Sequence, residues 1–505
     1  MALLAAQPSA PAGYRLTRPP TAVDRLRPKP PHDTARSWIV TLVVTAIAAV
    51  TRLWAIGFPE EKIFDEVYYP KNAAEMLRQG YENNPGRLYV VHPPLGKWCI
   101  AAGIKLFGDN AVGWRFPAAV AGTVAVLLLI RIVRRMTGST LLGGIAGLLL
   151  TLDGLSLVMS RTSLLDIFLQ PFILAGFGCL VMDREQIRRR LAELVESGTE
   201  MTRLGPRLGP RPWRLAAAVL LGASCGVKWS GVYFVAGFAV LSVLWDRAAR
   251  RSAGVGSPTR GTIVRDLPAA VVVLILVPIG AYLLTWTGWF LGENGYERHW
   301  AVGHPSKHWG FIPGPLRSLW HYQSETLDFH EGLSSYHPYR SQPWAWLLDA
   351  RPVNFYYPKD VTGCGSSSCV RQIVSLGTPA LWWMFIPALV WMVWLLFSRR
   401  DWRAGAILMA FLAGWATWLE NTGRTMFFFY MIPVVPFLVM GVTMLLGDVL
   451  GRRDASETRR IVGLVAVCTY LALVVINFVW LWPILTGSKI TYAGWQARMW
   501  FSSWI

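Results

Sequence analysis

Two adjacent carboxylates, Asp65 and Glu66, stand in the segment "KIFDEVYYPKN", just after the first long apolar stretch of the chain. A carboxylate beside a membrane is costly, so each one is a candidate for function. An aspartate in such a position can take the proton of a hydroxyl group as that hydroxyl attacks an electrophilic carbon. The simpler interpretation of Asp65 is a carboxylate that caps a loop.

The chain places few other charges in or beside its apolar stretches: Lys97, Arg115, Asp153, Arg161, Asp166, Lys228, Glu420 and Arg424. We expect Arg161, Lys228 and Arg424 to lie near the same membrane surface as Asp65. Cations that face a carboxylate suit the transfer of a sugar from a lipid-linked phosphate, because they stabilise the departing phosphate while the carboxylate accepts the proton. No nucleotide or metal is required for this chemistry, and the sequence has no glycine-rich nucleotide-binding loop.

Several of these residues also have structural interpretations. In one interpretation, Asp153 and Asp166 form ion pairs with Arg161, and these pairs allow a membrane hairpin to turn in the interface. Arg115 is then an interfacial residue whose charged end reaches water, and Glu420 forms an ion pair with Arg424. A metal site is a further alternative, although the spacing of its candidate ligands is irregular and a divalent ion stays an open question: these are His299, His304, His308, His321, His330 and His337.

The elements that position these residues are membrane helices. Hydrophobic residues make up 53 % of the 505 residues and charged residues only 16 %, and apolar stretches of about 20 residues, long enough to cross a bilayer, recur along the chain. The net charge is +19, and more than half of the basic residues crowd into a few short segments beside apolar stretches. That distribution indicates cytoplasmic loops rather than nucleic-acid binding.

Placing every basic loop inside predicts an all-α polytopic membrane protein with about 11 transmembrane helices and two large loops outside, at 57–112 and 292–377. The apolar stretches 140–182 and 214–246 are each expected to form a hairpin. Single spans are expected at 38–56, 113–133, 267–291, 379–397, 404–421, 425–446 and 461–485.

The rest of the chain divides around this transmembrane domain of residues 38–486. Residues 1–37 are predicted to be a disordered cytoplasmic tail, and residues 487–505 an extracytoplasmic segment. Helical spacing of Leu316, Leu319 and Leu327 predicts an interfacial helix in the second outer loop. Cys364 and Cys369 in "TGCGSSSCVRQ" can meet across a short Gly/Ser loop, and a disulfide there implies an oxidising compartment.

The chain resembles a known family in seven segments that occur in the family's order: "FDEVYYPKNA", "VHPPLGKW", "GWRFPAAVAGT", "SRTSLLD", "CGVKWSG", "QPWAWLLDARPV" and "GRTMFFFYMIPVVPF". These resemble the protein O-mannosyltransferases, membrane enzymes of the GT-C glycosyltransferase class. The resemblance implies inverting transfer of mannose from polyprenyl-phosphate mannose to Ser or Thr of unfolded secreted proteins. It also implies that the enzyme works outside the membrane, with the secretion translocon as a possible neighbour.

The resemblance assigns roles to individual residues. Asp65 is similar to the family's catalytic base, and Glu66 to a neighbour that organises the site. His92, Lys97 and Arg115 fall on positions expected near the donor phosphate. Two residues of a later span, Arg424 and Tyr430, are expected to hold the lipid phosphate, with Arg161 and Lys228 as further cations near it.

One departure from the family pattern points to a bacterial member in the plasma membrane. Eukaryotic members carry a β-trefoil domain, called MIR, in the second outer loop, and residues 292–377 leave no room for it. The nearest alternative is a GT-C enzyme that places an aminoarabinose-like or other sugar on lipid A or a wall polymer. A transporter is the alternative from another class, but its charges would gather near the midplane of the membrane and in repeated halves.

Overall fold

The computed structural model describes residues 21–27, 31–82, 91–451 and 454–505. Most of the predicted tail lies outside these ranges. Within it, Ala22–Leu26 form helix α1, capped by the Thr21 hydroxyl, and residues 35–37 already belong to α2. The Leu26 side chain is fully buried in a small cluster with Ile187 and Leu191 of α8, so hydrophobic packing orders this segment.

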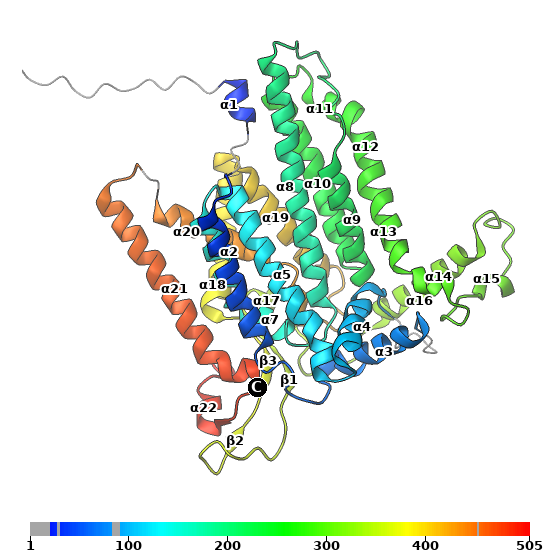
Figure 1. Cartoon of the computed structure of the whole chain (residues 1–505), viewed down its shortest axis with the longest axis vertical. Coiled ribbons are helices and arrows are strands. Elements are labelled where there is room, and N and C mark those ends of the chain that lie inside the picture. Colours follow the sequence, from blue (N-terminus) through cyan, green and yellow to red (C-terminus); the bar gives the residue numbers. More distant parts are fainter. Residues whose placement is uncertain (1–20, 28–30, 83–90, 452–453) are drawn as a thin grey trace, which may run out of the picture.

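The molecule is a bundle of membrane helices (Figure 1). Seven of the described helices are long and apolar enough to cross a bilayer: α2 (Ala35–Leu53), α5 (Ala111–Thr137), α8 (Asp166–Glu196), α10 (Gly231–Ser252), the run from α11 to α13 (Pro258–Thr285), α18 (Pro379–Arg399) and α21 (Glu457–Thr486). Four shorter helices complete the predicted path: α6 (Thr140–Thr151), α9 (Pro212–Val227), α19 (Trp402–Trp415) and α20 (Val435–Leu450). The run 258–285 is built of α11 (Pro258–Gly261), η2 (Thr262–Asp266), α12 (Leu267–Val271), η3 (Val272–Leu276) and α13 (Val277–Thr285).

The outer helices of the bundle expose apolar side chains. Only 17 % of the apolar window of α11–α13 and 28 % of that of α21 are buried within the protein. Their exposed residues include Ile275, Leu276 and Ile476. A soluble protein does not expose apolar surface of this extent, so these faces lie against lipid. The core is at the centre, where α20 is almost wholly buried among α6, α18, α19 and α21.

Both predicted hairpins are present. In the first, α6 and α8 are separated by a break that contains the short α7 (Gly154–Met159). In the second, α9 ends at Val227 and α10 begins at Gly231, with Lys228 between them in extended backbone conformation. The predicted span 425–446 differs at its start, because α20 begins only at Val435. The residues before it form a buried turn that includes η5 (Phe428–Met431).

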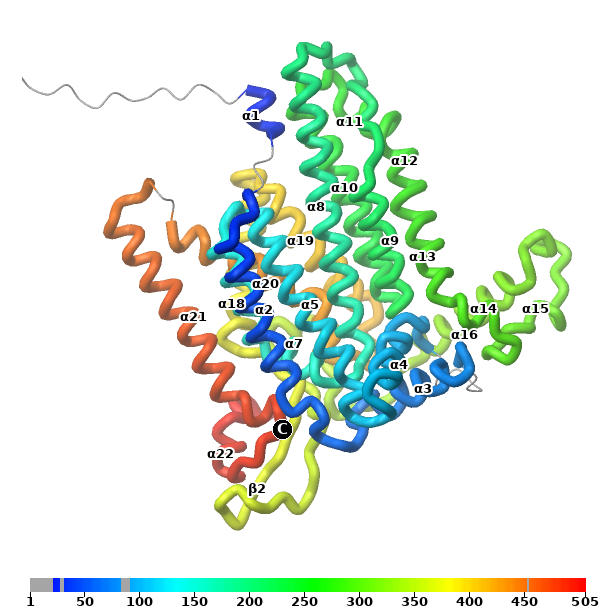
Figure 2. Tube along the Cα trace, viewed as in Figure 1, coloured from blue at the N-terminus to red at the C-terminus, as the bar shows by residue number. Residues whose placement is uncertain are grey.

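The two large loops gather at one end of the bundle (Figures 1 and 2). The first contains η1 (Phe64–Val67), α3 (Tyr69–Gln79) and α4 (Leu95–Phe107). After α14 (Thr287–Leu291), the second contains α15 (Trp300–Gly303), the predicted helix α16 (Gly314–Gly332), α17 (Pro343–Trp346), β1 (Val353–Tyr356), β2 (Cys369–Val370) and β3 (Ile373–Ser375). The remaining elements are η4 (Ala416–Leu419), β4 (Ile490–Thr491), α22 (Tyr492–Gln496) and η6 (Ser502–Trp504).

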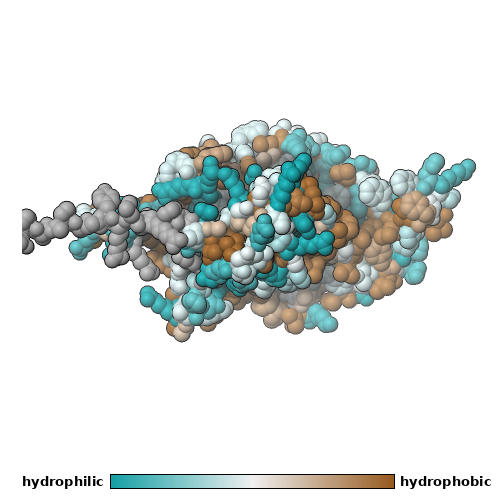
Figure 3. All heavy atoms as spheres, turned by 90° about the horizontal axis from the view of Figure 1, so that it is seen from above, coloured by the Kyte–Doolittle hydropathy of each residue, from teal (hydrophilic) through white to brown (hydrophobic). Residues whose placement is uncertain are grey.

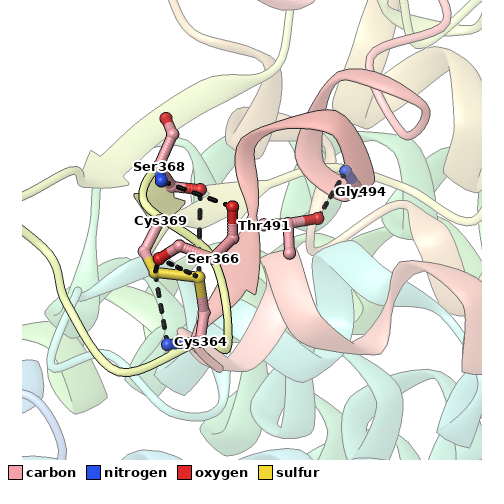
Figure 4. Close-up of a disulfide and its surroundings, with 6 residues drawn as sticks. All are labelled: Cys364, Ser366, Ser368, Cys369, Thr491 and Gly494. Carbon is pink, nitrogen blue, oxygen red and sulfur yellow. Dashed lines mark hydrogen bonds between the residues drawn. A yellow bond between two sulfur atoms is a disulfide. The ribbon is translucent and has the colours of Figure 1, made fainter.

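The C-terminal segment is fastened to the second loop. Strand β1 pairs with β3, and β2 pairs with β4, both antiparallel. Figure 4 shows the disulfide between Cys364 and Cys369 at the start of β2, beside Thr491 of β4. The Tyr492 amide donates a hydrogen bond to the Ser368 carbonyl at 3.0 Å. Cross-link and strand pairing together hold residues 487–505 against the loop.

Candidate active site

Asp65 lies on η1, which aromatic packing holds in place. The ring of Phe64 stacks on Phe355 at 4.8 Å between centroids, and it meets Phe427 and Phe429 edge-on, both at 5.6 Å. These partners come from β1 and from the turn before α20, so the aromatic residues beside the carboxylates join the first loop to two distant segments. Among the residues that the structure describes, none forms a hydrogen bond or ion pair with the Asp65 carboxylate.

Glu66 turns away from its neighbour into a fully buried ion pair with Arg115. Its two oxygens accept hydrogen bonds from Nε and Nη2 of Arg115 at 2.8 and 2.7 Å. They also accept the backbone amides of Ser163 at 2.8 Å and Ile63 at 3.0 Å. The Arg115 guanidinium bonds the Pro59 and Glu61 carbonyls as well. Both groups are thus engaged with the protein, and the pair fixes η1 against α5 and the turn before α8.

Lys228 and Asp166 form a second ion pair near Asp65. Lys228 Nζ lies 2.8 Å from Asp166 Oδ1 and 4.5 Å from the centre of the Tyr430 ring. Asp166 begins α8, and Lys228 follows the last residue of α9. Burial raises the pKa of Asp65 to about 6; the Lys228 ammonium opposes this shift and the Asp166 carboxylate adds to it. Asp65 therefore sits in a charged but poorly hydrated position, with a pKa suited to a base.

Two histidines and Arg424 lie beside this pair. The rings of His92 and His330 stack with centroids 5.2 Å apart, and His92 is 6.1 Å from the Tyr69 ring. Arg424 donates to the His330 carbonyl at 3.1 Å and lies 3.2 Å from its Nδ1. Burial, together with the nearby cations, holds the pKa of His92 well below its ordinary value and that of His330 at about 4. Both rings are therefore neutral near pH 7.

Two other predicted phosphate ligands are engaged elsewhere. Lys97 forms a buried ion pair with Glu82, with Nζ 2.7 Å from Oε1, and also donates to the His92 carbonyl at 3.0 Å. Arg161 donates to four backbone carbonyls at the end of α2, among them that of Trp54. It satisfies carbonyl groups that the helix leaves without partners. Protein groups therefore surround both cations.

The structural alternatives for other charges are resolved by their contacts. Asp153 caps α7 by accepting the Ser156 amide at 2.8 Å, and it also accepts Trp382 Nε1 at 2.7 Å. It does not pair with Arg161. Among the described residues no ion pair joins Glu420 to Arg424, whose side chain turns to His330 instead.

Of the outer-loop histidines, His330 belongs to the site and was not among the residues assigned to it from sequence. Its helix was predicted from periodicity, but the segment "DFHEGL" carries no signal for which neighbour its ring meets. In the described part of the chain, His321 is the histidine that lies with two carboxylates, Glu297 and Glu325, within 4.8 Å of one another. His321 is two and a half turns before His330 on α16.

Comparison with known proteins identifies the family. Residues 42–114 and 104–290 match the model of dolichyl-phosphate-mannose–protein mannosyltransferases, and residues 315–504 match the C-terminal four-transmembrane region of protein O-mannosyltransferases. The chain belongs to the protein O-mannosyltransferase family. A polyprenol-phosphate-mannose–protein mannosyltransferase of Mycobacterium tuberculosis is 45 % identical over 486 residues, covering 94 % of this chain and 93 % of the relative. One of Corynebacterium glutamicum is 35 % identical over 483 residues, covering 93 % of each.

Solved structures of this and related families share the fold. The Saccharomyces cerevisiae protein O-mannosyltransferase Pmt1–Pmt2 complex bound to the sugar donor superimposes with a TM-score of 0.72 at 15 % identity, covering 94 % of this chain and 93 % of that one. ArnT from Cupriavidus metallidurans in the apo state gives a TM-score of 0.51 at 15 % identity, covering 90 % and 77 %. The protein O-mannosyltransferase described here is thus a multi-pass membrane protein with the GT-C fold that its sequence predicts.

Proposed function

We propose that the protein transfers mannose from polyprenyl-phosphate mannose to Ser or Thr hydroxyl groups of secreted proteins, with inversion at the anomeric carbon. The observation that carries this proposal is the Asp65 carboxylate, which has no described partner and lies within the field of Lys228 at the end of the bundle where both large loops gather. Membership of the protein O-mannosyltransferase family supports the choice of donor and acceptor.

The reaction is a single displacement. Asp65 Oδ takes the proton of the acceptor hydroxyl while the hydroxyl oxygen bonds to the anomeric carbon of mannose. The bond between that carbon and the phosphate oxygen breaks, and polyprenyl phosphate leaves with the electron pair. A carboxylate with a pKa of about 6 is largely ionised at pH 7 and still basic enough to accept the proton.

The departing phosphate is held by a small set of groups. Arg424 is partly exposed, and its guanidinium is bonded only to His330 among the described residues, so donors remain for a phosphate. Lys228 adds positive charge beside the Tyr430 ring, and the neutral His92 ring supplies an N–H donor. His330 instead orients Arg424, because its Nε2 donates to the Val91 carbonyl and its Nδ1 accepts from Arg424. Divalent metal is not required in this scheme, because these groups stabilise the leaving charge.

The other predicted site residues act through position. The buried pair of Glu66 with Arg115 sets the orientation of η1, and therefore of Asp65. Lys97 of α4 is paired with Glu82 and donates to the His92 carbonyl. This contact fixes the backbone before α4 and so positions the His92 ring. Arg161 ties the break before α8 to the end of α2. These are positioning residues rather than phosphate ligands.

The orientation follows from the basic loops. The arginine-rich segments 184–214 and 247–265 lie at the end opposite to the two large loops, the first of which contains Asp65 (Figure 1). The positive-inside rule therefore favours a cytoplasmic location for that end and a site outside a bacterial plasma membrane. There the enzyme meets polypeptides leaving the translocon before they fold. Membrane-impermeant labelling of a single cysteine placed at Glu61 should succeed from outside, and labelling only from the cytoplasm would reverse the orientation.

The activity is tested with purified enzyme, polyprenyl-phosphate mannose labelled in the sugar, and a peptide that contains Ser and Thr. We expect labelled peptide in the presence of a metal chelator, and none with a matched peptide that has Ala in their place. Transfer to lipid A or to a wall polymer in preference to peptide would contradict the proposed acceptor. Mannosylated secreted proteins that persist when the gene is deleted would contradict the proposed role in the cell.

A further inference from the structure

A cavity lined by arginines opens at the end of the bundle opposite to Asp65. It has a volume of about 480 Å³ and is formed by the ends of α5 and α18, the start of α19, residues 184–188 of α8 and the segment with α1. The helices contribute Arg135, Arg184, Arg188, Arg399 and Arg403, and the segment with α1 contributes Arg25 and Arg27. Figure 3, which views this end, shows hydrophilic side chains gathered over it.

The carboxylates around the cavity neutralise only part of this charge. Glu185 pairs with Arg135 at 2.6 Å, and Asp401 pairs with Arg403 at 2.6 Å. These two are the acidic residues of the lining, against seven arginines, and Glu196 outside the lining pairs with Arg27. Arg184 is packed over the Trp402 ring at 3.8 Å, which fixes a planar, charged donor group at the wall of the cavity. The lining therefore carries a net positive charge and suits an anion.

A second, largely apolar groove meets this cavity. Its volume is about 260 Å³, and it runs between α5 and α8 along Leu128, Ile132, Ala175 and Met182. Arg135 lines both spaces, so the groove lies directly beside the cavity. Asp33, Arg131 and Arg134 also line the groove, and small side chains on α8, such as Ala175, leave this space open. An arginine cavity beside a largely apolar groove at the membrane surface matches a charged head and a hydrocarbon chain.

We propose that this composite site binds an anionic membrane phospholipid, with the phosphate of its headgroup among the arginines and an acyl chain in the groove. Guanidinium groups bind phosphate through paired hydrogen bonds, and basic pockets between membrane helices hold anionic lipid heads. The positive-inside rule accounts for arginines at this end of the bundle, but it does not require them to surround a cavity beside an apolar groove.

The N-terminal segment that carries α1 forms one wall of the site. Arg27 pairs with Glu196 of α8 at 2.7 Å, and the Arg25 carbonyl accepts a hydrogen bond from Arg188. A phosphate between Arg25 and the helix arginines bridges this segment to the bundle. Lipid binding thus stabilises the packing of α1 on α8 at the membrane surface.

The test uses the full chain, purified in detergent and stripped of lipid. Phosphatidylglycerol is added, and binding is followed by native mass spectrometry and by the unfolding temperature, with phosphatidylcholine and inorganic phosphate as comparison ligands. We expect phosphatidylglycerol to stay bound and to raise the unfolding temperature. Phosphatidylcholine should bind at least tenfold more weakly, because it lacks net negative charge, and phosphate alone should not stabilise.

Variants locate the binding. Arg188→Gln and Arg399→Gln are each expected to weaken phosphatidylglycerol binding about fivefold, the typical effect of one basic residue at an anionic membrane surface. Ala175→Phe, which fills the groove, is expected to abolish it. Arg251→Gln is the control. Arg251 lies in the last turn of α10, is exposed, and lines neither the cavity nor the groove.

Three results would overturn the proposal: equal binding of phosphatidylcholine, equal binding by Arg399→Gln and Arg251→Gln, or full stabilisation by phosphate alone, which would make the cavity an unselective anion site. Arg399 is exposed, so its substitution leaves the fold intact even where Ala175→Phe does not fold. The measurement is independent of mannosyl transfer, which all arginine variants should retain.

Discussion

The raised pKa of Asp65 predicts how transfer depends on pH. If Asp65 is the base, kcat/KM follows its ionised fraction, and activity is lost as the pH falls through about 6. A carboxylate with this pKa is ionised to about 91 % at pH 7 and about 9 % at pH 5, so activity should fall about tenfold between them. With the ordinary pKa of 3.8 it would still be about 94 % ionised at pH 5, and the profile would be nearly flat.

The site histidines and the donor phosphate do not produce this loss of activity at low pH. His330, with a pKa of about 4, is neutral from pH 5 upward, and burial and the neighbouring cations hold the pKa of His92 well below its ordinary value. The donor is a phosphodiester and stays ionised throughout. Since Lys228 lowers the pKa of Asp65, Lys228→Gln should move the midpoint to higher pH in the transfer assay with a Ser/Thr peptide. A wild-type profile that stays flat down to pH 5 would refute this reasoning.

Three further outcomes follow from the contacts. Arg115→Met leaves the Glu66 carboxylate buried without its cation and should lower the free energy of unfolding by about 3–5 kcal/mol. The measurement is the unfolding temperature, which should fall; an unchanged temperature would contradict the role of the pair. Arg424→Gln should raise the KM for the donor at unchanged unfolding temperature, and an unchanged KM would remove its role in phosphate binding. A double variant with Ser at both Cys364 and Cys369 should lose about 2 kcal/mol of unfolding free energy, because the loop is no longer cross-linked. Amide hydrogen exchange in β4 should become faster. Unchanged exchange would show that the strand pairing alone holds the C-terminal segment.

The arrangement of the helices could be predicted from the sequence because apolar length and arginine distribution are local signals. They placed both hairpins and put Asp65, Lys228 and Arg424 at one end. The error at residues 425–434 has a physical cause. An apolar segment such as "TMFFFYMIPV" is equally suited to a membrane helix and to a buried turn, and in the structure it packs under η1 through Phe427 and Phe429.

The partner of each charge could not be predicted in this way. A sequence shows that Lys97, Arg115 and Arg161 lie beside apolar stretches, but the cost of burying a charge is met equally by a ligand phosphate, a carboxylate or a row of carbonyl groups. The structure assigns these three cations to Glu82, Glu66 and the end of α2. For the same reason the site histidine His330 was missed, because its role depends on ring stacking with a residue of another loop.

The most direct test of the account is transfer by Asp65→Asn. Asparagine keeps the shape of the side chain but cannot accept the proton, while Lys228 and Arg424 stay in place to bind the donor. Purified Asp65→Asn should bind polyprenyl-phosphate mannose as the wild type does and transfer mannose to a Ser/Thr peptide at least about 100-fold more slowly. Transfer at the wild-type rate with normal donor binding would contradict the assignment of Asp65 as the base.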